Sequence, residues 1–220
     1  MVSFSYNFFC EVLDMRTERL DPYILSWEKG VFPLGGDALA LGEFSSVKPG
    51  WRVCDLGTGS GALLLLLARR EANLALTGID IDPLSARTAR KNLEANGLAG
   101  EILSGDLRAA PLPAGGFDLV ISNPPYFPVG SGLSGGPARS EECCALEELC
   151  AAAGRLTKNG GRFSLCHRPE RLADVICALR AHGLEPKRLR LVSHSPDHPP
   201  SLLLLEAVKQ GRPGLRIETG

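Results

Sequence analysis

The sequence predicts an α/β fold in which a seven-stranded, mostly parallel sheet carries helices on both faces. Apolar runs of strand length alternate with longer runs of helix length, which is typical of parallel sheets with helical crossovers. Gly and Pro residues separate these runs. The chain has 220 residues, of which 44% are hydrophobic and 22% charged. This length and composition predict one folded domain and exclude a disordered chain.

Strands and helices are expected to alternate from about residue 51 onward. The seven expected strands lie at residues 51–55, 73–80, 101–104, 117–122, 162–167, 188–192 and 201–208. The four expected helices lie at residues 62–70, 83–96, 142–156 and 169–181.

Local signals support these elements in turn. The first strand ends in a glycine-rich turn, and the helix after it is too apolar to be exposed, so it packs on the sheet. Pro83 and Gly97 bound the next helix. The last two strands flank a proline-rich turn and are expected to form a C-terminal β-hairpin. Residues 1–50 read as irregular or short helical pieces.

Composition and charge exclude several classes of protein. The net charge of -1 gives no bulk electrostatic reason to expect DNA, a membrane or an acidic ligand as partner. No apolar run approaches the ~18 residues of a membrane span, and the N-terminus does not resemble a signal peptide, so we expect a cytoplasmic protein. The 7 cysteines include no Cys-x-x-Cys pair. We therefore expect neither a disulfide framework nor a metal site.

A glycine-rich turn follows the first strand and is the first candidate binding site. It contains Asp55, Gly57, Thr58, Gly59 and Gly61. Glycines there let the backbone turn tightly and let a ligand approach closely. The spacing differs from the Gly-x-Gly-x-x-Gly of a dinucleotide site. A plain strand-to-helix turn without a ligand also explains these glycines. An acidic residue at the strand end favours a cationic ligand over an anionic pyrophosphate.

Two further acids end the next two strands. Asp80, followed by Ile81, is placed to accept hydrogen bonds from both hydroxyls of a ribose, and Asp106, followed by Leu107, from an adenine amine. Each acid alone is more simply a turn or cap residue. Because parallel strands end at the same edge of a sheet, the three acids together predict a pocket for S-adenosylmethionine, which carries a sulfonium and an ammonium group.

The fourth strand ends in the most specific motif of the chain, which we interpret as catalytic. Its residues are Asn123, Pro124, Pro125 and Tyr126. Prolines lack an N–H group, so nearby carbonyls face outward as acceptors. The side-chain oxygen of Asn123 and the carbonyl of Pro124 can hold both N–H bonds of a planar amine or amide while its nitrogen attacks a methyl group. The ring of Tyr126 can stack on an unpaired base.

These motifs resemble those of the class I amino-N-methyltransferases, which have a Rossmann-like domain. Residues 32–39, 167–171 and 211–215 resemble more narrowly the bacterial tRNA(Val) adenine-N6 methyltransferases. The resemblance implies a methyltransferase domain over residues 51–220, with residues 1–50 as an extension that closes over the cofactor. It also places Asp37 in that closing segment. Residues 33–36 depart from the family's usual pattern there.

The basic residues suggest where RNA would bind. Residues 1–150 contain 12 basic and 19 acidic residues, whereas residues 151–220 contain 12 basic and 6 acidic ones. Arg168 lies at a helix N-terminus, where the helix dipole disfavours a cation, so it is a candidate for a ligand contact. The predicted RNA-binding residues are Arg139, Arg168, Arg171, Lys187, Arg188 and Arg190. Scattered, solvated charges explain the same pattern equally well.

The leading hypothesis is an S-adenosylmethionine-dependent methyltransferase that acts on adenine N6 in RNA, most specifically a tRNA, and works as a monomer or weak dimer. A protein glutamine-amide methyltransferase uses the same motif but usually has a helical domain before the glycine loop, for which 54 residues leave little room. A DNA or ribosomal RNA adenine methyltransferase is a further alternative. The last is a cofactor-binding RNA chaperone without catalysis, which the intact catalytic motif disfavours.

Overall fold

The computed structural model describes residues 15–124, 146–193, 195 and 197–218. Its strands are β1 (Arg16–Leu20), β2 (Tyr23–Trp27), β3 (Arg52–Leu56), β4 (Ala75–Asp80), β5 (Gly100–Ser104), β6 (Phe117–Ser122), β7 (Thr157–His167), β8 (Leu184–Val192), β9 (Leu202–Lys209) and β10 (Arg216–Glu218). Its helices are α1 (Gly36–Phe44), α2 (Ala62–Arg70), α3 (Pro83–Ala95), α4 (Leu146–Leu156) and α5 (Leu172–Ala181), with 3-10 turns η1 (Leu107–Ala109) and η3 (Pro169–Arg171).

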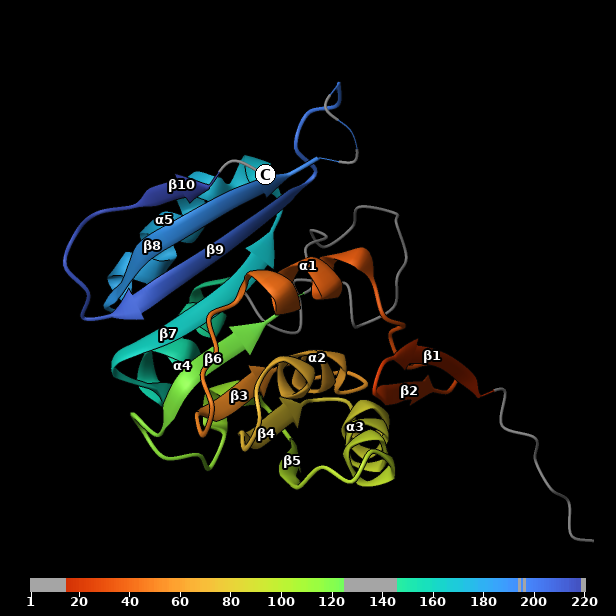
Figure 1. The fold of residues 1–220 in the computed structure, drawn as a ribbon. Coiled ribbons are helices and arrows are strands. Elements are labelled where there is room, and N and C mark those ends of the chain that lie inside the picture. The colour runs from red at the N-terminus through yellow and green to blue at the C-terminus, as the bar shows by residue number, and fades with distance from the viewer. Residues whose placement is uncertain (1–14, 125–145, 194, 196, 219–220) are drawn as a thin grey trace, which may run out of the picture.

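The main sheet has eight strands in the order β10-β8-β9-β7-β6-β3-β4-β5 (Figure 1). β3 is the first strand of this sheet along the chain. β4 and β5 are added on one side of it and β6 and β7 on the other side, all in parallel. A switch point therefore lies between β3 and β6, where such sheets bind ligands. β9 is antiparallel to both of its neighbours. The predicted α/β class and the C-terminal hairpin are confirmed.

The strand count was one too low, because β10 adds an eighth strand parallel to β8. This strand has only three residues and is largely exposed, so its sequence carries no alternating pattern of buried and exposed residues.

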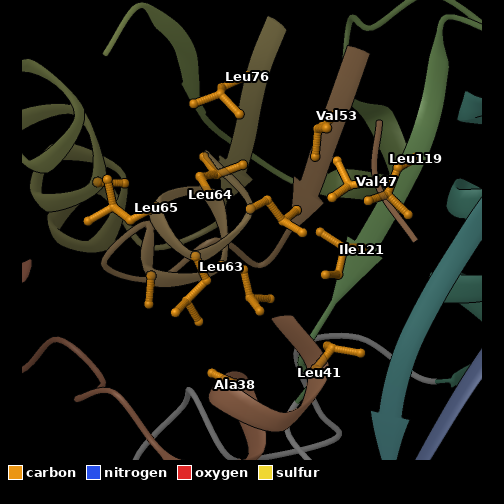
Figure 2. Close-up of a cluster of buried hydrophobic side chains, with 14 of the residues drawn as sticks. Ala38, Leu41, Val47, Val53, Leu63, Leu64, Leu65, Leu76, Leu119 and Ile121 are labelled. Atoms are coloured by element: carbon orange, nitrogen blue, oxygen red, sulfur yellow. The ribbon is translucent and has the colours of Figure 1, made fainter. Parts of the chain in front are cut away.

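Two apolar cores cover the two faces of the sheet. Successive strand residues point to opposite faces, so Val53 belongs to the core under α1, α2 and α3, while Cys54 belongs to the core under α4 and α5. Figure 2 shows the first core, in which Leu63, Leu64 and Leu65 of α2 meet residues of α1, β3, β4 and β6. These leucines are buried on both sides of α2 because α1 covers the outer side of that helix (Figure 1).

The N-terminal region contains a β-hairpin, and the expectation of irregular or short helical pieces is wrong for β1 and β2. The two strands pair with each other in antiparallel register. Asn96, directly after α3, donates to and accepts from the backbone of Ile24, and Asn92 of α3 does the same with Ser26, at 2.7–3.0 Å. The hairpin is therefore held by side chains that lie 66 or more residues later in the chain.

The longest helix in the described ranges, α3, has 13 residues. None of the helices described is long and apolar enough to cross a membrane.

Candidate active site

The candidate site lies along the edge where the parallel strands end. The register pairs Leu56 with Ile79 and Asp80 with Ser104, and it pairs Asp55 with Ile121 on the other side. The glycine loop, the two later acids and the Asn-Pro turn therefore leave the sheet at the edge where β3, β4, β5 and β6 end. The glycine loop and the Asn-Pro turn flank the switch point between β3 and β6.

The glycine loop adopts a backbone that favours glycine. Gly57, Gly59 and Gly61 have φ angles of 76°, 55° and 82°. A Cβ at Gly61 would lie 3.2 Å from the Cβ of Ala89, so this glycine lets α3 approach the loop. A Cβ at Gly57 or Gly59 would meet nothing within 4 Å. The loop thus presents bare backbone to an open side, where a ligand can approach.

Asp55 lies buried beneath this loop. The Thr58 hydroxyl donates to its Oδ2 at 2.8 Å, while its Oδ1 is buried without a hydrogen-bond partner among the residues described. Burial raises the pKa of Asp55 to about 7, and the negative charge of Asp80 adds to this against the opposing bond from Thr58. Gly78 makes room for Thr58, since a Cβ there would lie 2.9 Å from its hydroxyl oxygen.

Asp80 fixes the loop from the next strand. Its Oδ2 accepts from the Gly59 N–H at 2.7 Å, and its Oδ1 accepts from the Asp82 N–H at 2.9 Å. Burial raises the pKa of Asp80, although the two backbone hydrogen bonds act in the opposite direction. The neighbouring Ile81 is 52% exposed, which leaves an apolar surface beside the carboxylate.

These features fit S-adenosylmethionine. Buried carboxylate oxygen without a partner favours a nearby cation, the bare loop backbone admits close contact, and exposed Ile81 offers an apolar surface to a flat ring. The residues present can therefore hold a cationic nucleoside.

Asp106 has an internal partner that the sequence did not indicate. Its carboxylate accepts from the side chain of Arg108 at 2.5–2.9 Å, and these bonds lower the pKa of Asp106. Arg108 also donates to Glu148 of α4 at 2.9 Å. Leu107 is half-buried against the core under α4 and α5. The site edge at β5 is thereby tied to α4.

The Asn-Pro turn follows β6 directly. The Ser122 hydroxyl donates to the Leu56 carbonyl at 2.7 Å, which joins the start of this turn to the start of the glycine loop. The side-chain oxygen of Asn123 accepts from the Cys166 thiol at 3.0 Å, and Pro124 is partly exposed. Two further residues of the motif, Pro125 and Tyr126, lie outside the described residues.

Arg188 and Arg190, predicted to bind RNA, face carboxylates of the protein itself. Arg188 pairs with Glu206 at 3.1 Å and with Glu218 at 2.8 Å, and Arg190 pairs with Glu218 at 2.9 Å. Both guanidinium groups also lie over the ring of Phe44. The hydrogen bond from Arg188 is the main reason that the pKa of Glu218 is lowered to about 2.

The other predicted RNA contacts are placed differently. Arg168 is exposed directly after β7, at the same edge as the Asn-Pro turn. Arg171 forms an ion pair with a carboxylate of α5, and Lys187 donates to a backbone carbonyl. Arg139 lies outside the residues described. Asp37 lies half-buried in the first turn of α1.

Sequence reasoning missed Asn92, which links the hairpin to the site. Its Nδ2 donates to the carbonyls of Ser26 and Ser60 at 2.7 and 2.8 Å, and its side chain is buried. Ser60 belongs to the glycine loop, so one asparagine holds both segments. Asparagine is a weak helix former, and its place within α3 was the available signal.

Comparisons with known proteins show which family and fold this chain shares. Residues 35–171 match the family model described as methyltransferase small domain. A tRNA1(Val) (adenine(37)-N6)-methyltransferase of Porphyromonas gingivalis is 33% identical over 79% of this chain and 73% of its own length. The enzyme of the same name from Aeromonas salmonicida is 35% identical over 69% of this chain and 67% of its own length.

Solved structures share the fold. A predicted O-methyltransferase from Agrobacterium tumefaciens is 26% identical, with a TM-score of 0.67 over 82% of this chain and 84% of that one. The 16S rRNA N2 G1207 methyltransferase of Thermus thermophilus, solved with S-adenosylmethionine and guanosine, is 25% identical, with a TM-score of 0.65 over 89% of this chain and 50% of that one.

Proposed function

This chain belongs to the methyltransferase small domain family, and we propose that it methylates the exocyclic N6 of an adenine in RNA, most specifically a tRNA. A structure that shares its fold was solved with S-adenosylmethionine, which supports that cofactor. The observation that carries the proposal is the Asn123-Pro124 turn, which leaves the sheet beside the glycine loop and is tied to it through Ser122. The names of the relatives from Porphyromonas gingivalis and Aeromonas salmonicida support the tRNA substrate.

The cofactor side of the site binds and orients S-adenosylmethionine. S-adenosylmethionine supplies an electrophilic methyl group on a sulfonium. Asp80 accepts hydrogen bonds from the ribose hydroxyls, and Ile81 packs against the adenine ring. The backbone of Gly57, Thr58, Gly59 and Gly61 lines the open side of the loop. Asp55 acts from beneath the loop through its charge. Asp106 accepts from the adenine amine once that amine replaces Arg108 as its hydrogen-bond donor.

The acceptor side holds the amine that receives the methyl group. Asn123 Oδ1 and the Pro124 carbonyl each accept one N–H bond, which draws the nitrogen lone pair out of the aromatic system and aims it at the methyl carbon. A nitrogen–carbon bond forms as the carbon–sulfur bond breaks, and the nitrogen then loses one proton to water. No strong base is needed, because the proton leaves after transfer. Stacking of the target base on Tyr126 stays a prediction.

The proposed RNA surface begins at Arg168, because this residue is exposed at the edge that carries the Asn-Pro turn. Arg139, Arg171 and Lys187 stay predicted RNA contacts, of which Arg139 lies outside the described residues. The network around Glu206 and Glu218 holds Arg188 and Arg190, so any contact of these two with RNA requires them to be shared. We also propose that α1, with Asp37, forms part of the wall over the cofactor.

A specific observation supports one second candidate, a ribosomal RNA substrate. The Thermus thermophilus structure that shares the fold is named as a 16S rRNA methyltransferase acting on the N2 of a guanine. The same pair of acceptors can hold that exocyclic amine.

The test is incubation with labelled S-adenosylmethionine and, separately, unmodified tRNA, ribosomal RNA, DNA and protein, followed by nucleoside or amino-acid analysis. We expect label in N6-methyladenosine from tRNA. The variant Asn123→Ala should lose about 100-fold or more in transfer rate, as for loss of one preorganised catalytic hydrogen bond, while cofactor affinity is kept. Label in guanine or protein, or full activity of the variant, would contradict the proposal.

A further inference from the structure

Cys166 lies directly against the residue proposed to hold the acceptor amine. β6 and β7 run in parallel, with Ser122 opposite Leu165. Asn123 and Cys166 come directly after these two residues, so they are neighbours. The thiol donates to the Asn123 side-chain oxygen, with 3.0 Å between sulfur and oxygen. Cys166 is fully buried and Asn123 is partly exposed, so the thiol reaches the amide from the protein interior.

The thiol can fix the orientation of the Asn123 amide. An amide oxygen has two lone pairs, so it can accept from the thiol and from a substrate amine at the same time. If the amide turned over, its NH2 group would face a sulfur atom, which is a weak acceptor. The contact therefore favours the orientation in which oxygen, and not nitrogen, lies where the thiol and the amine meet.

Packing alone does not require a thiol at this position. Cys166 belongs to the apolar core under α1, α2 and α3, and it pairs with Leu204 across the sheet. A buried cysteine behaves mainly as a small apolar residue, and valine has a comparable size. The chemical difference between the two at this site is the S–H donor that faces Asn123.

We propose that Cys166 is a positioning residue for methyl transfer, which sets the amide of Asn123 for the acceptor amine before the substrate arrives. The inference rests on the proposed catalytic role of Asn123. It adds a residue on β7 to a site whose other acceptor-side residues follow β6.

Two substitutions separate positioning from packing. Cys166→Val removes the donor and keeps an apolar side chain, so it should fold as stably as the parent and lower kcat about 5- to 10-fold. Cys166→Ser keeps a donor but buries a more polar group. It should therefore be less stable than Cys166→Val but retain most of the activity. The order of stability and the order of activity are thus expected to be opposite.

The measurement is kcat at saturating labelled S-adenosylmethionine and unmodified tRNA, together with cofactor affinity and urea unfolding. Cofactor affinity should not change in either variant. Cys150→Val is the matched control, because Cys150 is also fully buried but lies in α4 on the other face of the sheet. That control should keep the parent kcat. Activity that follows stability across the variants would overturn the inference.

Two further readouts keep the outcomes distinct. If Asn123→Ala is fully active, the proposed function fails; if it is inactive while Cys166→Val matches the parent, only the role of Cys166 fails. The side-chain NH2 signal of Asn123 in an NMR spectrum, assigned by its loss in Asn123→Ala, needs no substrate. It should shift in Cys166→Val and stay near the parent position in Cys166→Ser. An unshifted signal in Cys166→Val would also overturn the inference.

Discussion

Buried and partly buried carboxylates on the two sides of the switch point are held in different ways. On the side of β3 and β4, Asp55 and Asp80 accept from a hydroxyl and from backbone N–H groups. On the side of β8 to β10, Glu206 is fully buried and pairs with Arg162 and Arg188, while Glu218 pairs with three arginines. In the part of the chain that the structure describes, no ion pair involves either aspartate.

The difference shows how one chain divides its charge between binding and stability. The C-terminal strands neutralise their acids internally, which is why part of the basic excess of residues 151–220 is already engaged. At the cofactor edge the buried Asp55 and the partly buried Asp80 have no cationic side chain as an ion-pair partner among the residues described. Burial raises the pKa of both aspartates as a result. A cationic ligand would relieve that cost.

The largest expected effect comes from disrupting the ion pairs on the side of β8 to β10. Glu206→Gln leaves Arg162 and Arg188 facing a neutral group, so we expect a loss of about 3 kcal/mol in the free energy of unfolding, since removing one partner of a buried pair typically costs 3–5 kcal/mol. Urea unfolding measures it. Glu101→Gln, on the exposed part of β5, is the control and should change stability by less than about 0.5 kcal/mol. Equal values for the two variants would remove the contrast between the two sides.

The second effect concerns cofactor binding by Asp80, on the side of β3 and β4. Asp80→Ala removes the acceptor proposed for the ribose and the support of the Gly59 N–H, so the Kd for S-adenosylmethionine should rise about 10- to 100-fold. Asp118→Ala is the matched control. Asp118 also lies on a strand of the sheet, but at the opposite edge, where it pairs with Lys158 and accepts from the Arg52 N–H. Calorimetric titration should show an unchanged Kd for this control; a similar rise in both variants would point to a general loss of structure.

Local patterns predicted the central part of the fold. The helix at 62–70 and the strand at 117–122 have the predicted bounds, because both are strongly apolar and end at clear Gly, Pro or polar signals. The hairpin of β1 and β2 was missed because half of its strand residues are exposed and only one residue of each strand is buried. It is held by hydrogen bonds to Asn92 and Asn96 and by burial of Leu20 and Leu25, and only the folded chain brings these partners together.

The candidate site was predictable where residues follow strand ends. The glycine loop, Asp80 and Asn123 meet at one edge because parallel strands end there. The partner of Asp106, Arg108, is only two residues away, but its second contact, with Glu148, depends on how η1 meets α4. The partners of Arg188 and Arg190 depend on the register of β8 with β9 and β10. The contact between Cys166 and Asn123 also depends on register.

The pH dependence of cofactor affinity is the most direct test of the claim that buried Asp55 interacts with the positive charge of the cofactor. The Asp55 pKa of about 7 lies above its ordinary value, so the group is largely protonated at pH 6 and largely ionised at pH 8. A cation binds better to the ionised form, so affinity for S-adenosylmethionine should rise with pH up to about 7 and then level off. In Asp55→Asn this rise should disappear, and any remaining change reports titration of other groups.

Calorimetric titrations of both proteins between pH 5.5 and 7.5 provide the measurement. The ratio of parent to variant affinity should increase several-fold, at most about tenfold, over this range, since one pKa unit corresponds to tenfold in an equilibrium constant. A ratio that stays constant with pH would contradict the account, because it would mean that the buried carboxylate beneath the glycine loop does not sense the charge of the cofactor.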